Sequence, residues 1–225
     1  MGGKSQVLHA VTRLKESLPT DKYGVAVVGL VDGDRGQSVA GSVSWDCCEI
    51  ENLMINVGAI EAAVKELNPS TTIGSEDISS AISESGTELI NEEIALRVQN
   101  QIGTTVFRPT GDDLNELRQS YTNEADKLAA ALTDEKYLDI TTSAQKIVEE
   151  MISDESFMRR FRGKRLLKFI FGKMRLTNVS YEQFCYSVAR HASKQPEIKT
   201  ELEELFGAID VIVSGQLEVL LTNEN

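Results

Sequence analysis

Two aspartates directly after an apolar run are the residues of this chain whose types and spacing most clearly suggest chemistry. Asp32 and Asp34 lie in the sequence VDGDRG, which ends the apolar run over 24–31. Residues two apart in an extended backbone project to the same side, and ligands of open α/β sheets bind at the carboxyl edge. Two carboxylates held close together repel each other unless a proton or a cation lies between them. A hard divalent ion such as Mg²⁺, which prefers oxygen ligands, fits such a pair.

The same residues also fit a plain turn. Asp and Gly are common in turns because of their backbone geometry. The motif by itself favours neither interpretation, since short motifs often mislead.

The elements that must position this pair are predicted from the hydrophobic pattern. Apolar residues at helical spacing over 4–17, followed by Pro19, predict a helix. The continuous apolar run over 24–31 fits a strand buried on both faces, as in a parallel sheet. Residues 42–45 are predicted to form a second strand, and residues 50–67 a helix.

The rest of the chain has mainly helical patterns. Helices are predicted over 75–97 and 112–132, with Ser and Asp as caps, and a short strand is predicted over 104–107. The predicted fold class is therefore α/β, with a small parallel-sheet core over 1–72. A largely helical region follows over 73–225.

A basic segment over 156–181 stands out in an acidic chain. The chain carries a net charge of −12, whereas this segment holds eight cations and no carboxylate. We interpret it as a surface that follows nucleic-acid phosphates. Arginines also dock onto acidic protein surfaces, including this chain's own acidic half, and a plain solvated helix face is the third interpretation.

Composition excludes several classes of protein. The net charge of −12 argues against a general nucleic-acid coat protein. Three cysteines cannot form a disulfide framework, which favours a reducing, cytoplasmic setting. The cysteines and histidines lack the spacing of structural zinc sites. No apolar run is long enough to span a membrane.

Three segments together resemble a known family. The sequences VVGLVDGDRG, WDCCEIENLM and FRGKRLLKFI resemble, in this order, segments of the TOPRIM domain of OLD-like nucleases. They are similar in particular to the TOPRIM effectors that accompany ABC-type ATPases in antiphage systems such as PARIS. The resemblance implies a TOPRIM-like core over 1–72 and a helical region beyond it.

The resemblance also implies functional residues and partners. Asp32 and Asp34 would be metal ligands together with Glu51, and Glu49 is the further acidic candidate. The ion would be Mg²⁺ or Mn²⁺, and the reaction cleavage of DNA or tRNA phosphodiesters. An ABC-type ATPase is the implied partner, a homodimer is compatible with the family, and no membrane is involved. The residues expected to contact nucleic acid are Arg35, Arg159, Arg160, Arg162, Lys164, Arg165 and Lys168.

One departure from the family pattern leaves a second hypothesis open. TOPRIM enzymes use a further glutamate at the end of their first strand, and here Met1 stands where it would lie. The first strand is then missing from this chain, or the residue has been lost. The alternative function is a catalytically inactive docking or sensing subunit.

A phosphohydrolase of the haloacid-dehalogenase type is the third hypothesis. Those enzymes also place Asp-x-Asp after a strand, with Asp32 as nucleophile and Asp34 as acid. Against this, Gly36 stands where such enzymes usually have Thr or Val, and a helix precedes the strand.

Overall fold

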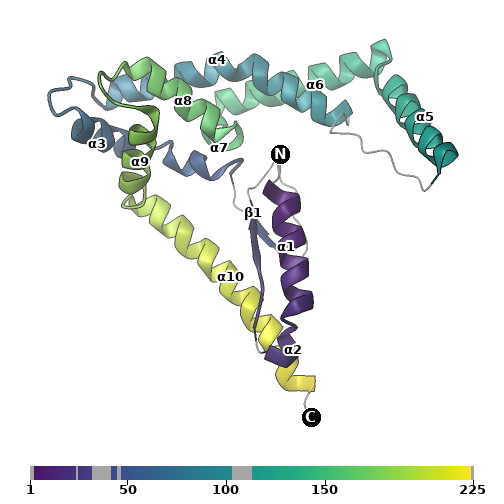
Figure 1. Ribbon diagram of the computed structural model, residues 1–225. Coiled ribbons are helices and arrows are strands. Elements are labelled where there is room, and N and C mark those ends of the chain that lie inside the picture. Colours follow the sequence, from purple (N-terminus) through teal and green to yellow (C-terminus); the bar gives the residue numbers. More distant parts are fainter. Residues whose placement is uncertain (1–2, 24, 32–41, 45–46, 103–112, 224–225) are drawn as a thin grey trace. The chain divides into compact units, whose positions relative to one another are not determined.

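The computed structural model describes residues 3–23, 25–31, 42–44, 47–102 and 113–223. Helices dominate these residues, and a pair of short parallel strands is the sheet found among them (Figure 1). This is compatible with the predicted α/β class, whereas the TOPRIM-like core stays a prediction. No helix in the described part of the chain is long and apolar enough to cross a membrane.

The chain divides into two compact units. The first unit joins residues 1–85 to residues 158–225, and the second consists of residues 86–157. This division differs from the sequence-based boundary at residue 72. The reason is that helices from the C-terminal third pack against the segment that follows the sheet, so the first unit is built from both ends of the chain.

The sheet of the first unit is small. Helix α1 (Gly3–Ser17) confirms the predicted helix, and α2 (Thr20–Tyr23) follows it. Strands β1 (Gly29–Val31) and β2 (Ser42–Ser44) pair in parallel, but β1 covers only the end of the predicted run. α1 packs closely on β1, because a Cβ at Gly29 would lie 3.0 Å from a methyl of Val11.

One continuous helix is predicted over 50–67, and this prediction is wrong because the structure has two helices there. The 3-10 helix η2 (Ile50–Met54) ends before Ile55, and α3 (Val57–Leu67) begins after Asn56. The Asn56 side chain accepts a hydrogen bond from the backbone N–H of Ala59 at 2.9 Å. Such a cap satisfies a free N–H at the helix start, so a new helix begins after Asn56.

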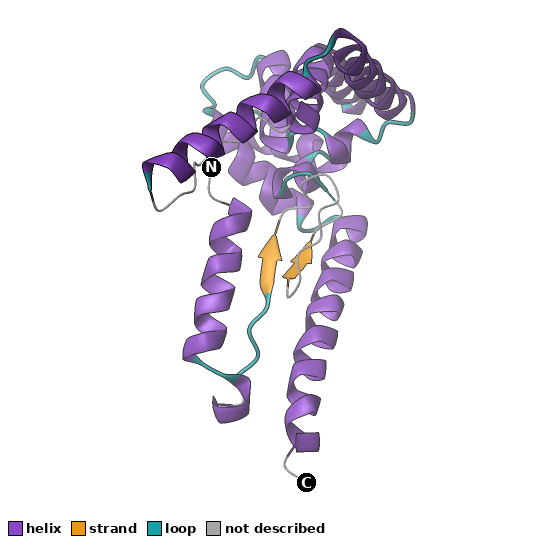
Figure 2. Cartoon of the chain, turned by 90° about the vertical axis from the view of Figure 1, so that its right-hand side faces the viewer, coloured by secondary structure: helices purple, strands orange, loops and turns teal. Residues whose placement is uncertain are grey.

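The C-terminal helices complete the first unit. These are α8 (Gly163–Met174), α9 (Tyr181–Ala192) and α10 (Pro196–Asn223), preceded by the short α7 (Phe157–Arg160). α9 packs against α3 and η2, and α10 packs against β2. Figure 2 shows the two strands between α1 and α10. Fully buried side chains on these helices include Leu166, Leu167, Ile170, Phe184 and Val188, and Phe161 between α7 and α8 is fully buried as well.

Helices make up the described part of the second unit. α4 (Ser75–Ile102) begins in the first unit and ends in the second, and α5 (Leu114–Ala131) and α6 (Asp134–Ser153) follow. The predicted helices over 75–97 and 112–132 are confirmed, with Asp113 accepting hydrogen bonds at the start of α5. The strand predicted over 104–107 lies outside the described residues.

Candidate functional site

The aspartates expected to bind metal are not part of the described structure. Asp32, Asp34 and Arg35 lie outside the described residues. β1 ends at Val31, the residue before Asp32, and it belongs to a parallel sheet. The described part of the predicted strand thus reaches the residue before the motif, while the metal-ligand roles of the two aspartates stay predictions.

The Glu49 side chain contacts the start of α8. Its Oε2 accepts a hydrogen bond from the backbone N–H of Lys164 at 2.8 Å, and its Oε1 lies 3.8 Å from Nε of Arg162. Only 16% of the side chain is exposed. A carboxylate at a helix start satisfies a free N–H and interacts favourably with the helix dipole. Glu49 thus caps α8 in this arrangement.

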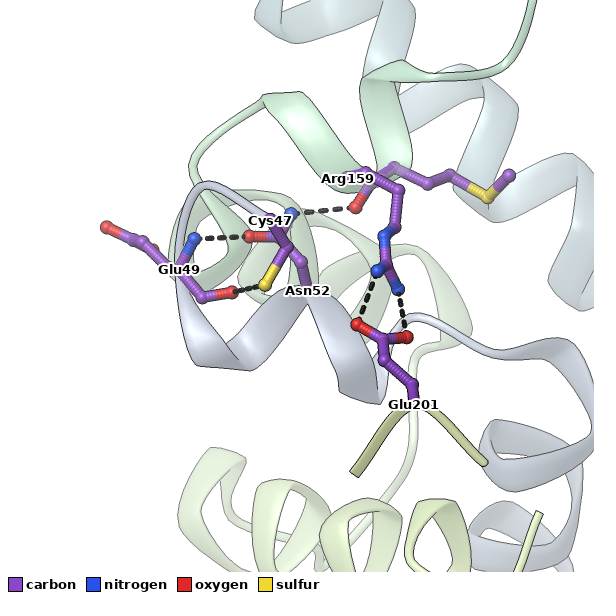
Figure 3. Close-up of polar contacts among 6 residues, drawn as sticks. Cys47, Glu49, Asn52, Arg159 and Glu201 are labelled. Atoms are coloured by element: carbon purple, nitrogen blue, oxygen red, sulfur yellow. Dashed lines mark hydrogen bonds and ion pairs between the residues drawn. The ribbon is translucent and has the colours of Figure 1, made fainter. Parts of the chain in front are cut away.

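Asn52 joins η2 to the segment before α8 (Figure 3). Its amide nitrogen donates to the carbonyl oxygens of Met158 at 2.7 Å and Phe161 at 3.0 Å, and its Oδ1 accepts from the N–H of Glu49 at 2.8 Å. The residue is only 2% exposed. A buried amide needs its hydrogen bonds satisfied, and here both ends of the amide are used.

Gly163 makes this contact sterically possible. A Cβ at that position would lie 2.7 Å from the backbone nitrogen of Asn52 and 2.8 Å from its Oδ1. The two segments of the resemblance that contain EIEN and FRGK are therefore packed directly on each other. The sequence does not reveal this contact, because Asn52 and Phe161 are 109 residues apart.

Arg159 is held by an acidic residue of α10. Its guanidinium donates two hydrogen bonds to the carboxylate of Glu201, one of them 2.9 Å long (Figure 3). Its backbone carbonyl accepts from the N–H of Cys48 at 2.8 Å. A bidentate pair fixes the guanidinium plane, so Arg159 is paired with a carboxylate of its own chain, one of the alternatives for the basic segment.

A cleft of about 550 Å³ lies between η2, α8 and α9. It gathers four of the seven residues expected to contact nucleic acid. Glu51 is the carboxylate among its lining residues, so the lining carries more positive than negative charge. Arg160 is half-buried and does not line it. The lining residues are Glu51, Met54, Arg162, Lys164, Arg165, Lys168, Tyr181, Cys185, Tyr186 and Ala189.

Glu49 and Glu51 lie close to cationic side chains of this chain. Oε1 of Glu51 lies 3.5 Å from Nζ of Lys164, and its side chain is 23% exposed. Four cations line the same cleft and would repel a divalent cation. Across the described residues, no three His, Cys, Asp or Glu side chains are grouped to hold a metal. Both glutamates therefore interact with protein cations in this structure.

Tyr181 and Cys185 are half-buried residues of one wall of the cleft, formed by α9. The Tyr181 hydroxyl donates to the carbonyl oxygen of Lys164 at 3.2 Å, and its ring lies 5.7 Å from that of Phe171. Burial raises the pKa of Tyr181 well above its ordinary value, and burial likewise raises the pKa of the Cys185 thiol, with Glu51 adding to the effect. Both groups stay protonated near neutral pH, so neither is an activated nucleophile.

A second polar cluster holds α9 against α3. The Glu66 carboxylate accepts hydrogen bonds from Arg190, from Nε2 of His191 at 2.7 Å and from Oγ of Ser187 at 3.1 Å. Arg190, followed by His191, lowers the pKa of Glu66 to about 2. This cluster fixes the helix that carries Tyr181 and Cys185.

Several of these residues are not singled out by any motif in the sequence. Asn52 lies inside a predicted helix, and Tyr181, Cys185 and Tyr186 lie beyond the densest part of the basic segment. One usable signal is the spacing of Tyr181, Cys185 and Ala189, which places them on one face of a helix. That pattern predicts a shared face but not the cations opposite it.

Comparison with known proteins gives no family assignment. No protein-family model, curated protein or solved structure matches the chain. The functional conclusions therefore depend on the cleft, the motif after β1 and the resemblance of the three segments.

Proposed function

We propose that this protein binds nucleic acid in the cleft between η2, α8 and α9 and acts as a TOPRIM-type nuclease. The observation that carries the proposal is the gathering of Arg162, Lys164, Arg165 and Lys168 around one cleft. Phosphodiester backbones attract such clusters because each Lys or Arg neutralises phosphate charge and releases counterions.

The acidic remainder of the molecule supports a local rather than a general binding surface. The chain carries −12 overall, so most of its surface repels a polyanion. A cleft lined by cations inside such a surface provides one favourable position for phosphate. Lys164 has a 65% exposed side chain and Lys168 is exposed, so both are accessible to a ligand.

Cleavage is assigned in this proposal to Asp32 and Asp34. Glu49 caps α8 and Glu51 faces Lys164, which leaves the two aspartates after β1 as the candidates for holding Mg²⁺ or Mn²⁺. Such an ion would stabilise charge on the scissile phosphate. The cations of the cleft bind and orient the strand. The resemblance supplies the proposed setting, which is antiphage defence with an ABC-type ATPase partner.

The test is a cleavage assay with matched variants. The purified chain is incubated with plasmid DNA and with total tRNA in Mg²⁺ or Mn²⁺, alone and together with a candidate ABC-type ATPase partner. We expect metal-dependent cutting that is lost in both Asp32→Ala and Asp34→Ala. Glu49→Gln keeps the shape of the cap and is expected to retain cutting, because Glu49 is not proposed as a ligand.

A second candidate function is a binding subunit without catalysis. The pairing of Glu49 and Glu51 with cations of this chain favours it. Binding of nucleic acid without cutting, by a protein that is folded and supplied with the ATPase, would select this function and reject the nuclease.

A further inference from the structure

An exposed tyrosine stands beside the four cations of the cleft. Tyr186 lines the cleft and is 74% exposed. It follows Cys185 on α9, a helix held in place by Glu66 and by the capping pair of Ser180 and Gln183. Large aromatic side chains usually bury most of their surface. Exposed aromatic rings occur elsewhere in the described part of the chain, but the ring of Tyr186 is distinguished by its place beside a basic cleft.

The neighbours of Tyr186 leave space beside its ring. Two of the residues that share this wall of the cleft, Cys185 and Ala189, have small side chains. The other aromatic residue of the wall, Tyr181, is partly buried, packs near Phe171 and uses its hydroxyl on Lys164. Tyr186 is therefore the aromatic residue of the described cleft whose ring a ligand reaches.

We propose that the cleft takes single-stranded nucleic acid, with one base stacked on Tyr186 and the adjoining phosphates on Arg165, Lys164 and Lys168. This inference rests on the proposed function and adds the class of substrate. Aromatic platforms beside a positively charged groove hold single strands because every base has a face that stacks, whatever the sequence.

A duplex should gain less from stacking on Tyr186 than a single strand does. Its bases are already stacked on their neighbours, and taking one out costs a few kcal/mol. The four cations attract the phosphates of both forms. Tyr186 therefore discriminates between the two forms, whereas the cations supply affinity for both.

The experiment measures binding rather than cleavage. A labelled single-stranded RNA of about 16 nucleotides, the upper range of single-strand site sizes, its DNA equivalent and the corresponding duplexes are titrated with the full chain in EDTA. We expect tighter binding of the single strands. Tyr186→Ala should weaken single-strand binding about tenfold and leave duplex binding unchanged, whereas Tyr186→Phe should bind as the wild type does, because stacking does not need the hydroxyl.

The control and the outcomes separate the two proposals. Tyr137→Ala removes a tyrosine of α6 that is 46% exposed and does not line the cleft, and it should change nothing. Equal binding of single strands and duplexes, with Tyr186→Ala neutral, would overturn this inference and leave the proposed function intact. Failure of the folded chain to bind any of the nucleic acids would overturn both. Circular dichroism establishes that each variant is folded.

Discussion

At the scale of single residues, one buried amide connects the parts of the site. Asn52 bonds to segments 106 and 109 residues away and to the backbone of Glu49. It lies next to Glu51, which faces the cleft, so the position of that carboxylate depends on the amide. An amide can make all three hydrogen bonds. A carboxylate at this position could not donate to the two carbonyl oxygens.

Replacing Asn52 should therefore destabilise the first unit. Asn52→Ala leaves two carbonyls and one N–H without their partner in a buried place, which we expect to cost roughly 2–3 kcal/mol. Urea unfolding measures the change. Asn123→Ala removes an exposed amide of α5 that accepts a hydrogen bond from Gln119, and it should stay within about 0.5 kcal/mol of the wild type. Equal midpoints for the two variants would contradict the role of Asn52.

The Glu66 cluster predicts a specific dependence of stability on pH. The folded-state pKa of Glu66 is lowered to about 2 from 4.5, with Arg190 as the main cause. Its stabilising contribution is therefore present above pH 4.5 and is lost as the pH falls towards 2. Glu66→Gln should lose less stability over this interval than the wild type, and Arg190→Gln should move the loss to higher pH. Urea midpoints at several pH values measure both effects, and identical acid profiles would contradict them.

At the scale of elements, α8 contains two glycines with opposite roles. Gly163 lies against Asn52, whereas a Cβ at Gly172 would meet nothing within 4 Å. We expect Gly163→Ala to destabilise by about 1–3 kcal/mol, because backbone must shift. Gly172→Ala should stabilise by about 0.5–1 kcal/mol, since alanine is the better helix former. Thermal or urea unfolding of both variants compares them within one helix, and a stabilising Gly163→Ala would refute the close packing.

The sequence predicts the helices of this chain better than their contacts. Hydrophobic spacing places α1, and helical pattern with Ser and Asp caps places α4 and α5, close to their observed bounds. It misses the break at Asn56, because the apolar pattern continues through the residue whose side chain caps α3. Strand β1 is shorter than its apolar run, since only Gly29–Val31 pairs with β2. Local pattern determines the helices, whereas pairing depends on partners elsewhere in the chain.

The candidate site is predictable only in part for the same reason. The basic segment and the EIEN motif are visible in the sequence, and the structure brings Glu51 together with Lys164 from these two segments. The sequence does not predict that Arg159 pairs with Glu201 or that Glu49 caps α8, because these partners are 42 and 115 residues away. Tyr186 belongs to the site because α9 packs against η2, and this packing is not visible in the sequence.

At the scale of the whole molecule, the distribution of charge determines how it meets a polyanion. The net charge of −12 opposes approach of nucleic acid, while the four cations of the cleft favour it. Binding should therefore weaken steeply with salt, because the attraction comes from a small number of phosphate contacts. Variants that remove cations from the cleft should reduce this salt dependence, and variants elsewhere on the surface should not.

The most direct test of the account is the salt dependence of nucleic-acid binding. Affinity for a labelled single strand is measured between about 50 and 200 mM salt for the wild type and for the double variant Lys164→Gln with Lys168→Gln. Lys65→Gln with Lys199→Gln is the control with the same change in charge, at two exposed lysines outside the cleft. We predict weaker binding and a slope lower by roughly 1.4 for the cleft variant only. Equal slopes and affinities for all three proteins would contradict binding in the cleft.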